Sequence, residues 1–176
     1  MKTTRHTPHL VRLTRLGAVN AYLVVEDDGL TLVDTMIPRS QDAILAAARD
    51  LGAPIVRIAL THAHGDHVGS LDALASALPQ AEVSISARDA RLMAGDRGLD
   101  PDEPQSRLRG GSPTIATRPG RTLRAGDRVG SLEVVAAPGH TPGHVAFLDT
   151  RDRSLIAGDV FTSYGKVAVS NHFYLR

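Results

Sequence analysis

The pattern of apolar and polar positions at the start of the chain predicts three strands. Residues 10–16 alternate imperfectly between apolar and polar side chains, and residues 20–25 and 30–33 form two further apolar runs. A short polar segment joins the last two runs and contains Asp28-Gly29, a pair typical of hairpin turns. We therefore expect these two strands to form a hairpin.

Two helices and a buried strand are predicted next. Residues 40–51 carry apolar side chains at helical spacing, with Ser40 as the N-cap and Gly52 just past the end. Residues 55–60 form a continuous apolar run with the length of a buried strand. Residues 70–78 repeat the helical spacing and stop at a proline.

Regular patterning is lost in the middle of the chain and returns near its end. A short strand is predicted over residues 83–86, whereas residues 93–120 are rich in Gly, Pro, Asp and Arg and indicate a long surface loop. Further strands are predicted over residues 132–137, 145–148 and 154–157. Because hairpins are mixed with strand–helix–strand units, the order predicts a mixed α/β (α+β) fold in a single domain.

Composition narrows the chemistry that this domain can carry. The 176 residues are 42% hydrophobic and 22% charged, which is typical of a globular protein, and they include no cysteine. Disulfides, iron–sulfur clusters, cysteine zinc sites and thiol catalysis are therefore excluded. A net charge of +1 and 3% aromatic residues argue against a nucleic-acid partner. A polar N-terminus and the lack of a membrane-length apolar run lead us to expect a cytoplasmic protein that acts on a small molecule and not at a membrane; its oligomeric state stays open.

Three histidines and an aspartate lie within six residues directly after the apolar run 55–60. Alternation along a strand places His62 and His64 on one face, and Asp66 and His67 follow where the chain turns. Imidazole and carboxylate together suit zinc and similar transition metals, whereas calcium and magnesium prefer oxygen alone. A solvated strand end would explain one histidine but not four candidate ligands so close together. The cluster therefore predicts a metal site.

Two later segments, and one earlier residue, match this cluster in kind. Residues 138–144 form a Pro- and Gly-rich turn with two histidines, of which we expect His140 to be a ligand and His144 to brace the turn through a hydrogen bond. Asp159 follows the strand predicted over residues 154–157, and Asp34 follows the strand over residues 30–33. Each motif places a polar side chain just past a buried strand.

Taken together, His62-Ala63-His64-Gly65-Asp66-His67, Asp34, the Gly-His-Thr-Pro-Gly-His turn at His140 and Ala-Gly-Asp at Asp159 resemble the metallo-β-lactamase superfamily. The four motifs occur in the family's order, and the match covers residues 10–161. The resemblance implies a four-layer αββα sandwich, two sheets flanked by helices, with a two-metal site at one edge.

The resemblance also implies roles for individual residues. His62, His64 and His140 would bind the first metal, Asp66 and His67 the second, and Asp159 would bridge both. Asp34 would orient a ligand by hydrogen bonds. The implied cofactor is Zn²⁺, two ions per complete site, with Fe or Mn as alternatives. Asp66 and Asp159 would also position the nucleophile, and Tyr164 would donate a hydrogen bond to a substrate carbonyl or leaving group.

The family completes its second metal site with a histidine further downstream. The only later histidine here is His172, which lacks the expected glycine turn, and we interpret it as a surface or substrate-side residue. We therefore expect residues 1–176 to be a domain that lacks its C-terminal strands and helix. Its second metal site would then be incomplete, part of its core would be exposed, and metal would bind tightly at most at the first site.

These features predict a metal-dependent hydrolase in which a metal-bound hydroxide attacks a small ester-like carbonyl: a thioester or a lactone, with a β-lactam ranked behind both. The alternatives are a ribonuclease or phosphodiesterase of the same superfamily, a single-iron sulfur dioxygenase, and a fragment that binds metal without turnover. Residues 97–128 contain seven arginines and four acidic residues. This excess of positive charge could attract acidic substrates, or it could be an ordinary solvated loop.

Overall fold

The computed structural model describes residues 1–105, 107–162 and 166–169. Its largest element is a seven-stranded sheet whose strands lie in chain order, β1-β2-β3-β4-β5-β6-β7. The first four strands are antiparallel, and β5 to β7 each run parallel to their predecessor. The strands are β1 (Lys2–Arg5), β2 (Leu10–Arg15), β3 (Val19–Glu26), β4 (Gly29–Val33), β5 (Ile55–Ala59), β6 (Glu82–Ser86) and β7 (Arg121–Leu123).

The change from antiparallel to parallel follows from the connections. Hairpins link β2, β3 and β4. The hairpin predicted between β3 and β4 is present, with Asp27 and Asp28 as its loop and Gly29 paired with Glu26. Helical crossovers then carry the chain back to the same end of the sheet, as parallel strands require. These helices are α1 (Gln41–Asp50), α2 (Gly65–Val68), α3 (Leu71–Ala77) and α4 (Ala87–Met93).

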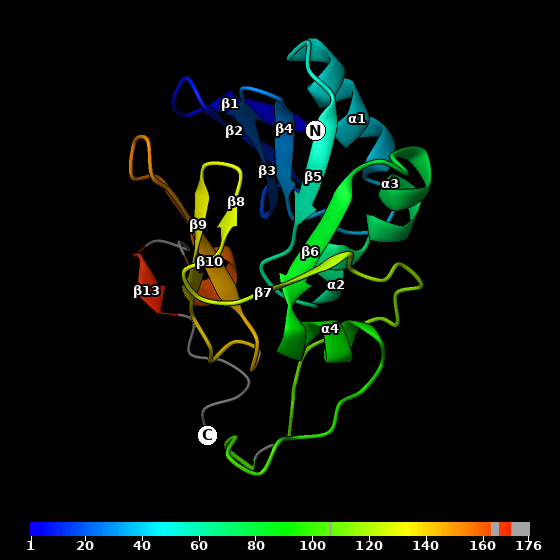
Figure 1. The fold of residues 1–176 in the computed structure, drawn as a ribbon, viewed down its shortest axis with the longest axis vertical. Helices are drawn as coiled ribbons and strands as arrows, with labels where there is room; N and C mark the ends of the chain where they lie inside the picture. The colour runs from blue at the N-terminus through cyan, green and yellow to red at the C-terminus, as the bar shows by residue number, and fades with distance from the viewer. Residues whose placement is uncertain (106, 163–165, 170–176) are drawn as a thin grey trace.

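A second, smaller sheet faces the first (Figure 1). Its order is β11-β10-β9-β8, antiparallel throughout, and a separate two-stranded ribbon, β12–β13, follows a single 3₁₀ turn, η1. These elements are β8 (Arg128–Val129), β9 (Leu132–Ala136), β10 (Val145–Asp149), β11 (Leu155–Ile156), η1 (Gly158–Val160), β12 (Phe161–Thr162) and β13 (Ala168–Val169).

Two hydrophobic cores cover the two faces of the large sheet. One lies between the sheet and helices α1 to α4, where Ile44, Leu71 and Leu92 pack against strand residues such as Leu32 and Ile58. The other lies between the two sheets and contains buried side chains of both: Val24, Val33, Val134, Phe147 and Ile156. Helices, large sheet and small sheet thus form three successive layers (Figure 1).

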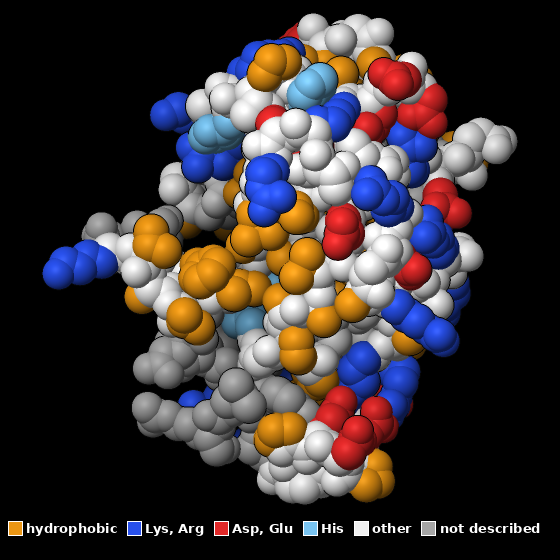
Figure 2. All heavy atoms as spheres, turned by 60° about the vertical axis from the view of Figure 1, so that its left-hand side comes forward, with side chains coloured by type: hydrophobic (Ala, Val, Ile, Leu, Met, Phe, Trp, Pro, Cys, Tyr) orange, Lys and Arg blue, Asp and Glu red, His pale blue; other side chains and the backbone are white. Residues whose placement is uncertain are grey.

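The outer side of the small sheet and its ribbon carries exposed apolar side chains. Val135, Leu155 and Phe161 are between 37% and 50% exposed. Figure 2 shows hydrophobic side chains gathered on this face of the molecule. It therefore contrasts with the opposite face of the same sheet, which is buried against the large sheet.

The mixed α/β fold predicted from the sequence is confirmed, and so are its longer elements and the irregular stretch before β7. Ser40 does precede α1, but its side chain makes no capping bond; its hydroxyl donates to the Ile37 carbonyl and accepts from Arg15. Among the described elements, the pattern missed eight short ones: β1, α2, α4, β7, β8, η1, β12 and β13. Among the described residues, no helix combines the length and apolarity needed to cross a membrane.

Candidate metal centre

The predicted ligands lie where strands of both sheets end. After β5 the chain stays extended through His62 to His64, which has φ −76° and ψ 152° and directly precedes α2. This short helix carries Asp66 and His67. The small sheet contributes His140, from the β9–β10 connection, and Asp159, in η1 after β11. The sequence motifs therefore meet in space, at the edge where the two sheets approach each other.

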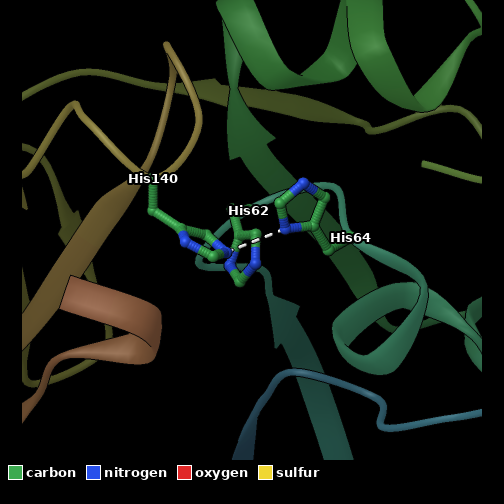
Figure 3. A group of neighbouring side chains, drawn as sticks. All are labelled: His62, His64 and His140. Atoms are coloured by element: carbon green, nitrogen blue, oxygen red, sulfur yellow. Dashed lines mark hydrogen bonds between the residues drawn. The ribbon is translucent and has the colours of Figure 1, made fainter. Parts of the chain in front are cut away.

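Three of the imidazoles form one compact group. The ligand atoms of His62, His64 and His140 all lie within 4.8 Å of one another, and His64 Nδ1 is 2.8 Å from His140 Nε2. Figure 3 shows the three rings pointing toward a common point: His62 and His64 follow β5, and His140 follows β9. In the part of the chain that the structure describes, His62 Nε2 is buried and makes no hydrogen bond. A buried nitrogen of this kind is costly unless it has a ligand.

A second group shares His62 and adds His67 and Asp159, whose ligand atoms again lie within 4.8 Å of one another. One carboxylate oxygen of Asp159 is 3.2 Å from His67 Nε2, and the other is 3.4 Å from His140 Nε2. Asp159 therefore presents one oxygen to each half of the cluster. This is the geometry expected of a carboxylate that bridges two metal ions.

Asp34 supports the cluster from the end of β4. It has a positive φ of 63°, and its carboxylate accepts hydrogen bonds from the Thr61 amide, the Thr61 hydroxyl and His67 Nδ1, at 2.8, 2.8 and 2.7 Å. The hydrogen-bond network thus assigns the Nδ1 proton of His67 and turns its Nε2 toward Asp159. The orienting role predicted for Asp34 has a concrete partner in His67.

Burial keeps most of these imidazoles neutral. It lowers the pKa of His140 to about 4 and that of His144 to about 3, and it lowers the pKa of His62 well below its usual value, each with help from neighbouring histidines. Only a neutral imidazole has a lone pair to give to a metal ion. The cluster therefore holds imidazole nitrogens that can bind a metal ion at neutral pH.

His67 behaves differently because two carboxylates face it. Burial by itself would lower its pKa, but Asp34 and Asp159 outweigh burial and raise it to about 10. Burial would likewise raise the pKa of Asp159, whereas the hydrogen bond from His67 and its charge hold it at about 2. A proton on His67 thus balances buried negative charge at the position where a metal cation would do the same. Neutral imidazoles, a neighbouring carboxylate and the buried, unpartnered Nε2 of His62 fit a site for divalent ions.

A family model described as the metallo-beta-lactamase superfamily matches residues 14–174. The chain belongs to the metallo-β-lactamase superfamily. The candidate ligands follow the ends of strands in the order in which the motifs occur in the sequence, so the family assignment and the geometry agree.

Relatives of this superfamily member include proteins with and without a named activity. The uncharacterized protein YobT of Bacillus subtilis (strain 168) is 52% identical over 156 residues, which cover 88% of this chain and 67% of that protein. A hydroxyacylglutathione hydrolase of Nostoc sp. is 28% identical over 162 residues, which cover 88% of this chain and 56% of the hydrolase. The chain therefore spans roughly half to two thirds of the length of these curated relatives.

Solved structures support the same fold. The structure named TTHA1623 in a di-iron-bound form matches with a TM-score of 0.68 at 33% identity, over 90% of this chain and 75% of that one. A β-lactamase from Chitinophaga pinensis matches with a TM-score of 0.66 at 26% identity, over 84% of this chain and 56% of that one. The fold of this superfamily member is thus the metallo-β-lactamase type that the motifs implied.

The remaining predicted site residues are less central in the structure. The side chain of Asp66 is half exposed, and its carboxylate lies 3.7 Å from His67 Nε2, outside both compact groups. His144 is buried and, as expected, hydrogen-bonded: its Nε2 accepts from the Asp159 amide at 3.1 Å, while its ring stacks on His62. Tyr164 and His172 lie outside the described residues.

Sequence reasoning missed several residues of this superfamily member that contact the site. The carboxylate of Asp89 binds the backbone beside His62 and His64, and the carbonyl of Arg109 lies 3.3 Å from His64 Nε2. Gly110, with φ +82°, packs so closely on the His64 ring that any side chain would overlap it. A capping pattern, Ser86 followed three residues later by Asp89, could have revealed α4, and Ser86 does cap that helix. No local signal marks the contacts of the loop.

Proposed function

We propose that this protein is a metal-dependent hydrolase of small ester-like substrates, with a thioester or a lactone ahead of a β-lactam. The observation that carries the proposal is the convergence of four largely buried histidines, His62, His64, His67 and His140, with the partly exposed Asp159 where strands of both sheets end. Hydroxyacylglutathione hydrolases among the relatives support acyl chemistry on a thioester. Near-neutral charge and few aromatic residues favour this substrate class over a phosphodiester of nucleic acid.

In this proposal His62, His64 and His140 would hold one ion, Asp66 and His67 would hold the other, and Asp159 would contribute to both. Bound divalent ions supply Lewis acidity toward a carbonyl and lower the pKa of water. The chain's own groups fix the geometry: Asp34 orients His67, and His144 holds the backbone of Asp159. Zinc is the proposed metal. Iron and manganese are the alternatives, and the di-iron form of TTHA1623 supports including iron in any test.

A pocket beside the cluster favours a substrate with a negative charge. It has a volume of about 300 Å³ and is lined by Arg97, Leu99, Arg107 and Leu108. Arg97 donates to the carbonyls of Leu108 and Gly110, and Gly110 packs against His64, so the pocket belongs to the loop segment that reaches the first metal group. We propose that a carboxylate of the substrate binds here while its acyl group lies at the metal centre.

The charges around the pocket support this proposal. Three acidic residues of the same loop, Asp96, Asp100 and Glu103, pair with Arg88 and Arg91 of α4. By contrast, the arginines that line the pocket form no ion pair within the described residues. Unpaired guanidinium groups at a pocket attract anions and bind carboxylates well.

The test is a comparison of substrates on protein loaded separately with zinc, manganese and iron. We expect measurable turnover of a thioester or a lactone and none of a bis-phosphodiester, and we expect chelation to remove the activity. Turnover of the phosphodiester alone would overturn the proposal. Oxygen consumption with a persulfide and iron, without ester hydrolysis, would favour the dioxygenase alternative, and stoichiometric metal without any turnover would favour a metal-binding fragment.

A further inference from the structure

A buried carboxylate outside every sequence motif connects the two halves of the first metal group. Asp89, in the first turn of α4, is 0% exposed. One of its oxygens accepts a hydrogen bond from the Gly143 amide at 2.8 Å. The other accepts from the Ala63 amide at 3.0 Å and from the Thr141 hydroxyl at 2.6 Å. Both oxygens therefore accept hydrogen bonds from the chain itself.

The partners of Asp89 are the immediate neighbours of candidate ligands. Ala63 lies between His62 and His64 on the large-sheet side, and Thr141 follows His140 on the small-sheet side. One side chain thus fixes two segments that are far apart in the sequence and belong to different sheets. A shift of Asp89 would change the distance between His140 and the other two histidines.

The surroundings of Asp89 are built for this close approach. The Ser86 hydroxyl accepts from the Asp89 amide at 3.1 Å and holds the start of α4 against the turn. A side chain at Gly143 would overlap both Ser86 and Asp89, so only glycine lets the turn come this near. Two residues of the Gly-His-Thr-Pro-Gly-His motif, Thr141 and Gly143, thereby gain a common partner.

We propose that Asp89 is a positioning residue that presets the geometry of the metal group formed by His62, His64 and His140. It touches neither metal nor substrate and acts through the backbone on either side of the ligands. Groups that hold ligands in place commonly change metal affinity by about 10- to 100-fold when removed. The inference rests on the proposed metal centre but not on the identity of the substrate.

The test is Asp89→Asn, in which an amide nitrogen replaces one acceptor oxygen and faces a donor. The matched control is Asp72→Asn, because Asp72 also accepts from two backbone amides and one threonine hydroxyl, those of Ala116 and Thr117. We measure Co²⁺ and Zn²⁺ dissociation constants, the visible spectrum of the Co²⁺ form, and the unfolding of the metal-free protein. We expect Asp89→Asn to weaken binding at the first site about 10-fold or more and to change the Co²⁺ spectrum. Asp72→Asn should leave both unchanged.

A milder variant keeps the test decisive if Asp89→Asn does not fold. Thr141→Val removes one of the three bonds at nearly constant volume, and we expect it to weaken Co²⁺ binding roughly 2- to 10-fold, the range of a single net hydrogen bond. If Asp89→Asn and Thr141→Val, or whichever of them folds, keep the metal affinity and the Co²⁺ spectrum of the unaltered protein, the role of Asp89 is merely structural and the proposal is overturned. An equal loss of metal affinity in Asp72→Asn would also overturn it. Stoichiometric metal without ester hydrolysis in the unaltered protein would refute the proposed function alone, whereas no metal binding at all would refute both.

Discussion

A single carboxylate, Asp34, orients two neighbouring histidines by different routes. It accepts a hydrogen bond directly from His67 Nδ1, and it also accepts one from the Thr61 hydroxyl. The Thr61 oxygen is then left to accept from His62 Nδ1, 3.0 Å away. The network therefore places a proton on Nδ1 of both rings and turns Nε2 of each toward the cluster. In the proposed metal centre, this orientation would make Nε2 of each ring the metal-binding atom.

Asp66 offers a clean separation of chemistry from folding, because its side chain is half exposed. We expect Asp66→Asn to lower kcat/KM about 100-fold or more, since a neutral amide is a poor replacement for a carboxylate ligand. The unfolding free energy of the metal-free protein should change by no more than about 0.5 kcal/mol. Steady-state kinetics, metal analysis and urea unfolding measure the three quantities. Asp42→Asn, an exposed aspartate of α1, is the matched control, and equal activity in the two variants would contradict the assignment.

Gly158 allows Asp159 to approach the cluster. It has φ +53°, and a Cβ there would lie 2.7 Å from His144 Nε2 and 2.9 Å from the Thr61 Cβ. We expect Gly158→Ala to destabilise the protein by about 3 kcal/mol or more, because a left-handed conformation costs about 1–2 kcal/mol and the overlap adds to it. Gly52→Ala isolates the backbone cost, since Gly52 has φ +74° with nothing within 4 Å. Equal destabilisation of the two variants in urea unfolding would show that the contact with His144 is unimportant.

The candidate ligands after β5 were predictable because their spacing is local: two histidines two residues apart, just past a strand, followed by an aspartate and a histidine, predict a metal site. The role of Asp89 could not be predicted, because the ligand-side partners of its carboxylate lie 26 to 54 residues away and no pattern within α4 indicates them. Gly110 was hidden for the same reason. Contacts that exist only after the sheets and the loop come together leave little trace in the neighbouring sequence.

At the scale of elements, the long irregular segment before β7 is part of the site. The Gly65 amide at the start of α2 donates to the Gly111 carbonyl at 2.8 Å, and the Arg109 carbonyl approaches His64. These two contacts attach residues 109–111 of the loop to the metal group.

Arg107 is the better of the two pocket arginines for a test of substrate charge, because Arg97 also supports the loop through two carbonyls. We compare S-acetyl-N-acetylcysteine with S-acetyl-N-acetylcysteamine, thioesters that differ by one carboxylate. Arg107→Gln should raise KM for the acidic thioester roughly 3-fold, the scale of an exposed ion pair, and leave the neutral one unchanged. Added salt should reduce the difference.

Arg124→Gln is the matched control for this substrate comparison, since Arg124 is an exposed arginine between the loop and the small sheet and does not line the pocket. It should leave KM for both thioesters unchanged. An equal rise in KM in the two variants would indicate a general effect of net charge. A rise in KM for the neutral thioester with Arg107→Gln would indicate a disturbed loop.

Which elements were predictable depended mainly on their length. The hairpin strands β3 and β4 and the helix α1 carry enough apolar repeats to fix their type. β7 and β8 have three and two residues, which are too few to show alternation. They are defined instead by their pairing with β6 and β9. Tertiary contacts rather than local propensity therefore define the edges of both sheets.

At the scale of the whole molecule, the two sheets are joined at both ends of their interface. At one end Glu26, in β3, accepts from the amide and the hydroxyl of Ser131 in the β8–β9 turn, at 3.1 and 3.0 Å. At the other end lies the histidine cluster, with His62 and His64 following the large sheet and His140 and Asp159 following the small one. A metal ion held by both sides would connect the sheets directly.

Because candidate ligands follow both sheets, we expect the stability of the fold to depend on metal. A ligand that binds only the folded state at 100 times its dissociation constant adds about 2.7 kcal/mol, which corresponds to a rise in Tm of roughly 5–10 °C for a chain of this size. We expect zinc to produce such a rise, and hydrogen exchange to slow in both sheets, because the site takes ligands from each. His140→Ala removes the small sheet's histidine and should abolish most of the rise, whereas His6→Ala, a histidine near the N-terminus and away from the cluster, should retain it. If zinc protected only the large sheet, or raised the Tm of His140→Ala as much as that of the unaltered protein, the ion would be held by one sheet alone, and the bridging role of the cluster would be wrong.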